Sequence, residues 1–579
     1  MGAHRFPAPS PRGPQDRMDT PAAAPGYRLH LTSPTWTRGS SPAAHLWRPL
    51  PPRAGDLASV LRRPPEQRTG AWTLVEEHDG GLRLSTDRTR SHHLLFARAG
   101  GTWVVCDDPQ EMRRLVPSWR RDEAAAEVFL HTAFTVGTTT LVRGVRATPA
   151  GAVVELRPDG SWTSRPWEAY RYDPEPITAP EEFSAVFRDA LDATVERMLR
   201  DVGDRRLLVP LSGGLDSRLL AAWLKRHGAR NAAAFTYGVP GSAETAVSRD
   251  VAGALGLDWF CVELDPAEVA RAWAGPDGAD FQERTWGATS LPHVQDWYAL
   301  LTMRERDLVD ADAVFLPGHT IVGNMHDEDL LDGGPSRARV LTAVAAHHCP
   351  LQGDGGAWRR LPRLRREVVR AADEVSFPDG ARSVQELIEW FNIRERQAKY
   401  INGSMKAYEA FGYGWALPML DVEVWRTWLR GSQELTATRR WYRSFTAEAF
   451  AEATGTTTRL FEPPAARIPA APRRVLLAAL RVTGMRAAVT RAVSVRTMLH
   501  HPMAFEAFNE PMARPEQLMR MARGAGSLGL WTRLFLDGTW GERPVAPPAR
   551  GRPAPRRALR RDATDRRRCA TPMPSPRGR

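Results

Sequence analysis

The residues Leu208–Leu220 read LVPLSGGLDSRLL, an apolar run that enters a turn rich in glycine and serine. A helix-like pattern follows the turn at once. Between a parallel strand and a helix, free backbone N–H groups and the positive end of the helix dipole attract anions. The pattern therefore predicts a loop that holds phosphate groups.

The residue types in this turn suit that task. The glycines let the backbone approach a ligand closely, and the serines add hydroxyl donors. Asp216 is the odd member, because a carboxylate beside phosphates needs a cation between them, and we expect it to bind Mg²⁺. The expected ATP- and pyrophosphate-binding residues are Leu211, Ser212, Gly213, Gly214, Leu215, Asp216 and Ser217.

A Walker A loop is the obvious rival, but it needs a Gly-Lys pair, and the chain contains none. The order Ser-Gly-Gly-x-Asp-Ser instead resembles the signature of the N-type ATP pyrophosphatases. The resemblance implies that the loop holds the β- and γ-phosphates while an oxygen nucleophile attacks the α-phosphorus. A glycine-rich turn that arose by chance is the alternative.

Two different patterns of elements surround this loop. From Tyr27 to about Trp167, short β-type runs alternate with the turn signals HDGG, RAGG and RPDG, which predicts an antiparallel sheet domain with a helix near Asp122–Thr135. A Pro-rich linker and a helix follow. From Arg206, buried strands and helices alternate, as in a doubly wound parallel α/β sheet. After about residue 335 strand signals vanish, and we expect helices to dominate to about Trp540.

The chain from about Tyr27 to Trp540 resembles the asparagine synthetase family. Its N-terminal runs are similar to the family's glutaminase-type domain, and a later helical run is similar to the stretch that ends in the signature E-x-R-x-P-F-L-D. The segments that carry the resemblance are Gly70–Asp108, Phe129–Leu156 and Arg394–Asp421, in which Pro418, Leu420 and Asp421 match the signature.

This resemblance implies a domain plan. An N-terminal antiparallel αββα domain of the Ntn-hydrolase type would precede a doubly wound ATP pyrophosphatase domain with a helical C-terminal part. The expected divisions are a disordered extension over residues 1–26, a degenerate glutaminase-like domain over 27–178, the synthetase-like domain over 179–540 and a disordered Arg/Pro-rich tail over 541–579.

The first departure from the family concerns glutamine hydrolysis. A glutaminase of this type uses an N-terminal cysteine as nucleophile. Residue 2 is glycine, Met18 is followed by Asp19, and no cysteine precedes Cys106, which lies inside a strand-like run. We therefore predict that the first domain keeps its fold without glutaminase activity, so that free ammonia or an amine of the substrate is the nucleophile.

The second departure follows the predicted strand Asp310–Gly318. There the family usually reads Ser-Gly-x-Gly-x-Asp-Glu, whose aspartate helps to bind magnesium, whereas this chain reads GHTIVGNMHDEDLL over Gly318–Leu331. Gly318 is still expected to lie against the nucleotide. Asp327 either substitutes as a metal ligand or belongs to a solvated acidic turn.

Two further roles have no direct counterpart. Gly414 holds the place of the signature glutamate, so Glu409 is the candidate for handling the amine proton, with a structural ion pair as its alternative. Lys399 and Arg467 are the candidates for neutralising the departing pyrophosphate. The segments Ser290–Leu301 and PGHT suggest a branch of synthetase-like proteins found with biosynthetic clusters.

Composition limits the other function classes. The net charge is +12, of which the stretch Gly541–Arg579 carries +9 with twelve arginines and three acids, so a nucleic-acid role would concern this tail alone. The four cysteines form no C-x-x-C pair, and the doublets His92–His93, His347–His348 and His500–His501 lack metal-ligand spacing. No run of residues is long and apolar enough for a membrane span.

The resulting hypothesis is an AMP-forming, ATP- and Mg²⁺-dependent amide synthetase in the cytoplasm. It would adenylate a small-molecule or peptide carboxylate for attack by ammonia or an amine, and a homodimer is compatible with it. The alternatives are a nucleotide-binding or regulatory protein without turnover and a tRNA-modifying pyrophosphatase. The latter class usually needs reactive cysteines or a zinc ribbon.

Overall fold

A computed structural model defines the placement of most of the chain. Among the helices that it describes, none is both long and apolar enough to cross a membrane. Residues 1–25 and the Arg/Pro-rich tail, for both of which we predict disorder, lie outside the described part, as does Arg467. The described residues are 26–40, 43–50, 56–380, 382–456 and 486–538.

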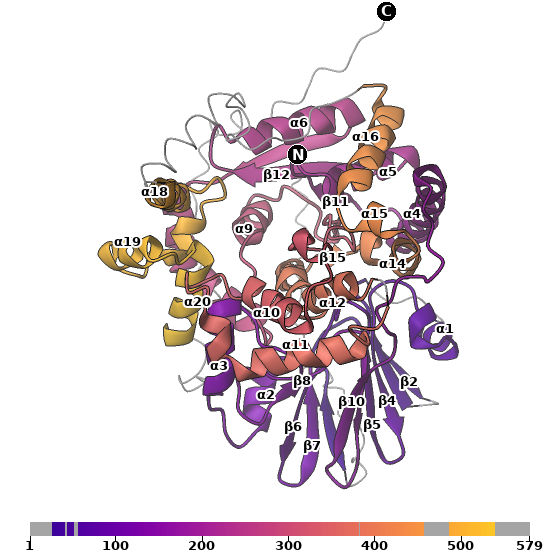
Figure 1. Ribbon diagram of the computed structural model, residues 1–579, viewed down its shortest axis with the longest axis vertical. Coiled ribbons are helices and arrows are strands. Elements are labelled where there is room, and N and C mark those ends of the chain that lie inside the picture. The colour runs from indigo at the N-terminus through magenta and orange to yellow at the C-terminus, as the bar shows by residue number, and fades with distance from the viewer. Residues whose placement is uncertain (1–25, 41–42, 51–55, 381, 457–485, 539–579) are drawn as a thin grey trace, which may run out of the picture.

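The N-terminal strands form the lower end of the molecule in Figure 1. They are β1 (Tyr27–His30), β2 (Trp36–Ser40), β3 (Ala43–Trp47), β4 (Thr73–His78), β5 (Gly81–Thr86), β6 (Leu95–Ala99), β7 (Thr102–Cys106), β8 (Arg146–Ala147), β9 (Ala152–Leu156) and β10 (Trp162–Pro166). They make a six-stranded sheet in the order β10-β9-β5-β4-β3-β2 and a four-stranded sheet in the order β1-β7-β6-β8.

This arrangement corrects the expectation of purely antiparallel pairing. The six-stranded sheet is antiparallel throughout, but β1 pairs with β7 in parallel. No hairpin joins β1 to β7, and a period-two pattern specifies faces rather than the direction of the neighbouring strand.

Two of the predicted turns are confirmed as tight hairpins. Asp79 and Gly80 join β4 to β5 with φ values of 48° and 74°, and Gly100 and Gly101 join β6 to β7 with 58° and 80°. Positive φ at both central residues is the mark of a type I′ turn, whose twist matches that of the flanking strands. The glycines in HDGG and RAGG therefore fix the register of both hairpins.

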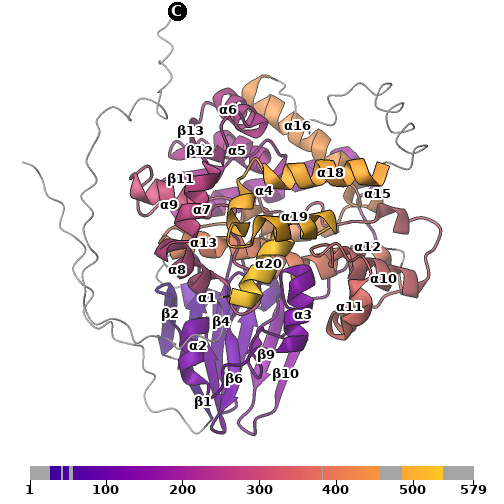
Figure 2. The ribbon, with the colours of Figure 1, turned by 90° about the vertical axis from the view of Figure 1, so that its left-hand side faces the viewer.

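The two sheets pack face to face over a shared core. Val75 of β4, Phe96 of β6 and Val105 of β7 belong to one buried cluster. On the outer face of the six-stranded sheet, Leu46 and Leu74 pack with helix α1 (Asp56–Arg62). The helices α2 (Pro109–Leu115) and α3 (Glu123–Thr132) lie beside the sheets on the other side of the core (Figure 2).

A five-stranded parallel sheet forms the upper part, in the order β13-β12-β11-β14-β15. Its strands are β11 (Leu207–Pro210), β12 (Ala232–Gly238), β13 (Asp258–Glu263), β14 (Val314–Phe315) and β15 (Gly414–Trp415). β15 is a strand within the part of the chain after residue 335, where helices dominate as expected. A two-residue strand has no periodicity of its own, and pairing with β14 defines it.

Helices cover both faces of this sheet. Val209 of β11 packs in one buried cluster with Leu220 and Phe445, whereas its neighbour Leu208 packs in the other cluster with Trp297 and Tyr408. Alternate residues of one strand thus meet different helix layers. The helices that follow α3 up to residue 305 are α4 (Pro180–Val202), α5 (Asp216–Arg226), α6 (Ala243–Leu255), α7 (Pro266–Trp273), α8 (Pro276–Thr285) and α9 (Trp297–Glu305).

Helices dominate the rest of the described chain. A π-helical segment, η4 (Asn392–Ile401), interrupts them beside the site. The others are α10 (Arg337–His347), α11 (Pro362–Glu374), α12 (Ser383–Phe391), α13 (Met405–Ala410), α14 (Val422–Leu429), α15 (Gln433–Thr436), α16 (Arg440–Thr454), α18 (Arg486–Leu499), α19 (Arg514–Ala522) and α20 (Ser527–Gly538).

Candidate active site

The loop between β11 and α5 is folded onto the first turn of the helix by its own serines. The backbone N–H of Ser212 donates to Ser217 Oγ at 3.1 Å, and the two hydroxyl oxygens are also 3.1 Å apart. Gly214 donates its N–H to Ser212 Oγ at 3.2 Å. The N–H groups in the first turn of α5 lack helical partners, so this compact loop presents donors to an anion.

Gly318 lies directly against this loop. A Cβ atom at Gly318 would stand 2.6 Å from the backbone nitrogen of Ser217 and 3.0 Å from the carbonyl carbon of Asp216. Because β14 is hydrogen-bonded beside β11, the segments that follow the two strands meet at the same sheet edge. Only glycine allows this approach, and the structure thus brings the predicted Gly318 against the predicted loop.

A cavity of about 210 Å³ opens beside the loop. Five of the seven predicted loop residues line it, together with Gly318. The rest of the lining comes mainly from β12, from the chain that enters α9 and from the segment after Gly318. The lining loop residues are Leu211, Ser212, Gly214, Asp216 and Ser217, and the lining residues used below are Tyr237, His293, Asp296 and His319.

Asp296, which lines this cleft, joins the lining Tyr237 to Tyr408. The hydroxyls of Tyr237 and Tyr408 each donate to one oxygen of the buried Asp296 carboxylate. Burial, and then the charge of Asp296, raises the pKa of both phenols well above the usual value. Both tyrosines therefore stay protonated, and the carboxylate is held rigidly in place.

Two uncharged histidines line the cleft. Burial lowers the pKa of His293 and of His319 to about 4, so both rings are neutral at physiological pH. Asn402 Oδ1 lies 3.0 Å from His319 Nδ1 and also accepts from Gln397 at 2.9 Å. An oxygen at that position assigns the hydrogen of His319 to Nδ1, which leaves the Nε2 lone pair as an acceptor.

The two segments that carry these histidines and Asp296 are already distinctive in the sequence. His293 and Asp296 lie in the segment Ser290–Leu301, and His319 lies in PGHT, two stretches that stood out without an assigned role. Their shared position is set by tertiary structure, since the segments follow different elements of the parallel sheet.

Asp216 is already paired. Its carboxylate accepts a hydrogen bond from the guanidinium of Arg439, which precedes α16. Burial raises the pKa of Asp216, while the charge of Arg439 opposes that rise. A carboxylate engaged by arginine does not suit a magnesium ion as it stands, because Mg²⁺ needs free oxygen ligands in an octahedral arrangement.

The remaining predicted residues lie away from the lining of the cleft. The ammonium of Lys399 is buried and donates to Thr135 O and Gly137 O, both at 2.8 Å, and to Glu395 at 2.6 Å. Its three donors are thereby used. Glu409 accepts from the indole N–H of Trp415 at 3.0 Å, and Asp327 pairs with His326 at 2.9 Å.

In the N-terminal part, aromatic side chains fill the space between the sheets. The ring of His92 stacks on Trp47 at 4.4 Å, and its Nε2 lies 3.2 Å from Asp107. Burial alone would raise the pKa of Asp107, but hydrogen bonds from His92 and Trp36 hold it below the usual range. Burial raises the pKa of the Cys106 thiol well above its ordinary value, so this sulfur is no thiolate.

A second cavity, of about 290 Å³, lies where the six-stranded sheet meets the residues after β15. Asp421 lines it and joins the two parts of the chain. Its carboxylate accepts from Gly70 N at 3.0 Å, and Arg197 donates to it at 3.0 Å. The signature residue Asp421 thus has a structural role at this junction.

Comparison with known proteins identifies one stretch of the chain. Residues 186–293 match the family described as asparagine synthase. The match begins inside α4, contains the whole loop Ser212–Ser217 and ends at His293 in the cleft wall. It confirms the resemblance drawn from the sequence. No curated protein matches the chain.

Proposed function

We propose that the protein is an ATP-dependent, AMP-forming amide synthetase. The proposal starts from the match of residues 186–293 to the asparagine synthase family. The observation that carries the proposal is the cleft itself. It combines a serine- and glycine-rich loop at a helix N-terminus with Gly318 against its backbone and two neutral histidines in the same lining. ATP-dependent amide formation is the general chemistry of that family.

The domain plan belongs to the same proposal. Residues 27–178 would be a degenerate Ntn-type domain, and residues 179–540 the ATP pyrophosphatase-type domain with its helical C-terminal part. The two facing sheets of the first part and the parallel sheet of the second support this division. Residues 1–26 and 541–579 would be extensions outside both domains.

In the first half-reaction, an oxygen of the substrate carboxylate bonds to the α-phosphorus of ATP, and the bond to the bridging oxygen of pyrophosphate breaks. The loop N–H groups and the hydroxyls of Ser212 and Ser217 would hold the departing pyrophosphate. Arg439 adds a positive charge beside Asp216. Fixed donors aimed at developing charge are the main source of catalysis in such transfers.

In the second half-reaction, an amine nitrogen bonds to the acyl carbon, AMP leaves, and one proton must depart. His319 is the better candidate for accepting that proton, because it lines the cleft with a free Nε2 lone pair, whereas Glu409 does not line it. The nucleophile would be ammonia or an amine of a small-molecule or peptide substrate. The buried, protonated Cys106 supports the absence of glutaminase chemistry.

Magnesium would neutralise phosphate charge when bound with the nucleotide. Asp216 as its ligand stays a prediction, because Arg439 engages this carboxylate. The same contact favours the second candidate function, a nucleotide-binding or regulatory protein without turnover. A protein of that kind would bind ATP and release no pyrophosphate.

Pyrophosphate release from ATP separates the two candidates. We expect release that depends on a carboxylate from a panel of amino acids and peptides, with a loss of about 100-fold or more in Asp216→Ala. Asp258→Ala is the matched control, because Asp258 is an exposed aspartate at the start of β13, outside the cleft. ATP binding without release across the whole panel would reject the ligase.

A further inference from the structure

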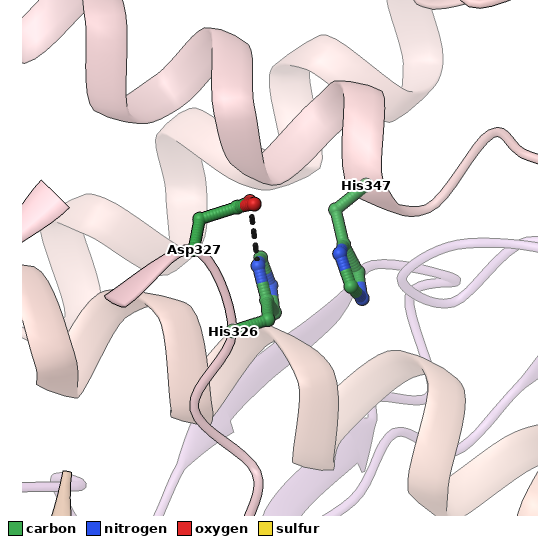
Figure 3. Close-up of side chains that lie close together, drawn as sticks. All are labelled: His326, Asp327 and His347. Atoms are coloured by element: carbon green, nitrogen blue, oxygen red, sulfur yellow. Dashed lines mark hydrogen bonds and ion pairs between the residues drawn. The ribbon is translucent and has the colours of Figure 1, made fainter. Parts of the chain in front are cut away.

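Three potential metal ligands lie close together near the surface, at the C-terminal end of the segment that begins at Gly318. His326 and Asp327 come from this segment, and His347 is the last residue of α10 (Figure 3). One ligand atom from each residue lies within 4.8 Å of the other two. Asp327 and His347 are exposed and His326 is half-buried, so an ion from solvent can reach the cluster.

The donor types select the class of ion. Mg²⁺ and Ca²⁺ prefer oxygen ligands, whereas two imidazole nitrogens with one carboxylate oxygen suit Zn²⁺ and its neighbours among the divalent transition metals. Three protein ligands also leave one coordination position for water. We propose that His326, Asp327 and His347 form a binding site for a zinc-class divalent ion, separate from the nucleotide cleft.

The spacing of the ligand atoms fits one shared ion. Bonds of about 2.0–2.1 Å at tetrahedral angles place two ligand atoms about 3.3 Å apart. His326 Nδ1 and Asp327 Oδ2 are 2.9 Å apart, and the rings of His326 and His347 stack with centroids at 3.5 Å. The ion takes the place of the hydrogen between His326 Nδ1 and Asp327, and the neutral imidazole carries its one proton on Nε2 instead.

Binding also reorients the rings. The planes of His326 and His347 are only 7° apart, so their lone pairs lie in parallel planes and do not converge on one point. The χ2 torsion of histidine is soft, and a turn about the Cβ–Cγ bond brings both nitrogens onto the ion. The stacked pair is therefore the metal-free arrangement, and metal binding separates the rings.

The surroundings set the packing and the charge of the site. The buried His348 packs beside the pair, with its ring centroid 5.1 Å from that of His347 and 4.9 Å from that of Phe391. Arg396 is the nearby cation, and its charge acts on all three histidines. The positive charge of Arg396 therefore repels a bound divalent ion and weakens its binding.

The site has a mechanical consequence for the cleft. His326 and Asp327 stand eight and nine residues after Gly318, and His347 stands on a separate helix. An ion shared by these residues pins the far end of the segment to α10, while its near end lies against the loop at Ser217. The metal thus restrains the same segment that carries His319.

The test uses the full-length protein, freed of metal with a chelator and titrated with Zn²⁺ in competition with a chromophoric chelator. We expect one ion per chain at this site, and His347→Ala and Asp327→Asn should each weaken binding about 10- to 100-fold. Asp327→Asn nearly keeps the side-chain shape, and equal thermal unfolding of the metal-free proteins establishes that both variants fold. Arg396→Gln should tighten binding, since it removes the opposing charge.

His78→Ala is the matched control, because His78 and Asp79 form another adjacent, exposed pair at 3.1 Å without a second histidine. It should leave Zn²⁺ affinity unchanged. With Co²⁺ as the probe, we expect the visible spectrum of nitrogen and oxygen ligation. Absence of binding, equal affinity in wild type and His347→Ala, or a thiolate charge-transfer band would each overturn the site.

Discussion

The chain leaves two neighbouring strands of the parallel sheet, β11 and β14, at the same edge but in different ways. Leu207 pairs with Val314 and Leu208 with Phe315, so the two exits lie side by side. After β11, a short turn enters α5 directly. After β14, the chain takes no regular structure until the short helical turn η2 (Glu328–Leu330).

The difference lies in where each segment finds its partners. The loop after β11 closes on itself, through contacts between Ser212 and Ser217 only five residues apart. The segment after β14 is held from a distance, because His319 bonds to Asn402, which is 83 residues away. A self-contained loop keeps its shape in any context, whereas the second segment depends on the helices around it.

The largest expected effect comes from forcing the two segments apart. Gly318→Val would place a side chain at 2.6 Å from Ser217 N, where only backbone shifts can relieve the clash. Such overpacking costs about 1–3 kcal/mol, and we expect ATP affinity to fall about 100-fold. Isothermal titration with ATP measures this loss.

Gly253→Ala is the control for Gly318→Val, because Gly253 lies on α6 with open space where a Cβ would stand. It should bind ATP like the wild type. If Gly318→Val also keeps wild-type affinity, the close approach of the two segments has no part in nucleotide binding.

The next largest effect is expected from replacing His319, the proposed proton acceptor on the segment after β14. His319→Asn should slow amide formation about 100-fold and leave pyrophosphate exchange nearly unchanged, since adenylation needs the loop and not this ring. Amide product and ATP–pyrophosphate exchange are measured on the same preparation. Glu409→Gln is the comparison, and a larger loss of amide product there would transfer the role back to Glu409.

The pH profile sharpens the same point. With its pKa lowered to about 4 by burial, His319 stays unprotonated until the pH approaches that value. After allowance for protonation of the amine nucleophile, the amide-forming step should therefore show no titration near pH 6.5, where an exposed histidine would protonate. A decline centred near 6.5 in the wild type would contradict the assignment.

A moderate effect is expected at the ion pair between the loop and α16. Arg439→Gln removes the charge that engages Asp216, so the carboxylate becomes free for Mg²⁺. We expect ATP binding to become about tenfold more dependent on added Mg²⁺, as measured with and without EDTA. The neighbouring, exposed Arg440→Gln should not change this dependence.

The smallest effect is expected at Asp421, at the junction with the N-terminal sheets and away from the segments that follow β11 and β14. Asp421→Asn weakens the contacts to Arg197 and Gly70 and should lower the free energy of unfolding by about 1–2 kcal/mol. Denaturant titration measures this loss. ATP affinity should stay at the wild-type value, and a parallel loss of binding would show that the junction and the cleft are coupled.

The same contrast between local and distant contacts explains which parts of the fold could be predicted from the sequence. The turns at Asp79–Gly80 and Gly100–Gly101, the strand β11 and the helix α5 follow from local pattern, and all are confirmed. The parallel pairing of β1 with β7 and the two-residue strand β15 carry no local signal, because each is defined by a distant neighbour.

For the site, the sequence supplied the loop and the position of Gly318. It could not supply the cluster around Asp296, since Tyr237, Asp296 and Tyr408 come from different elements and meet through hydrogen bonds over 59 and 112 residues. It also could not place His347 beside His326, because the spacing along the chain fits no metal-binding motif.

The buried ammonium of Lys399 has a consequence for dividing the chain. It ties the carbonyls of Thr135 and Gly137, beyond α3, to Glu395 of η4, more than 250 residues away. A fragment that stopped near residue 178 would lose this bridge and expose those carbonyls. The N-terminal sheets and the helical part are therefore expected to melt together, and neither is expected to survive proteolytic separation intact.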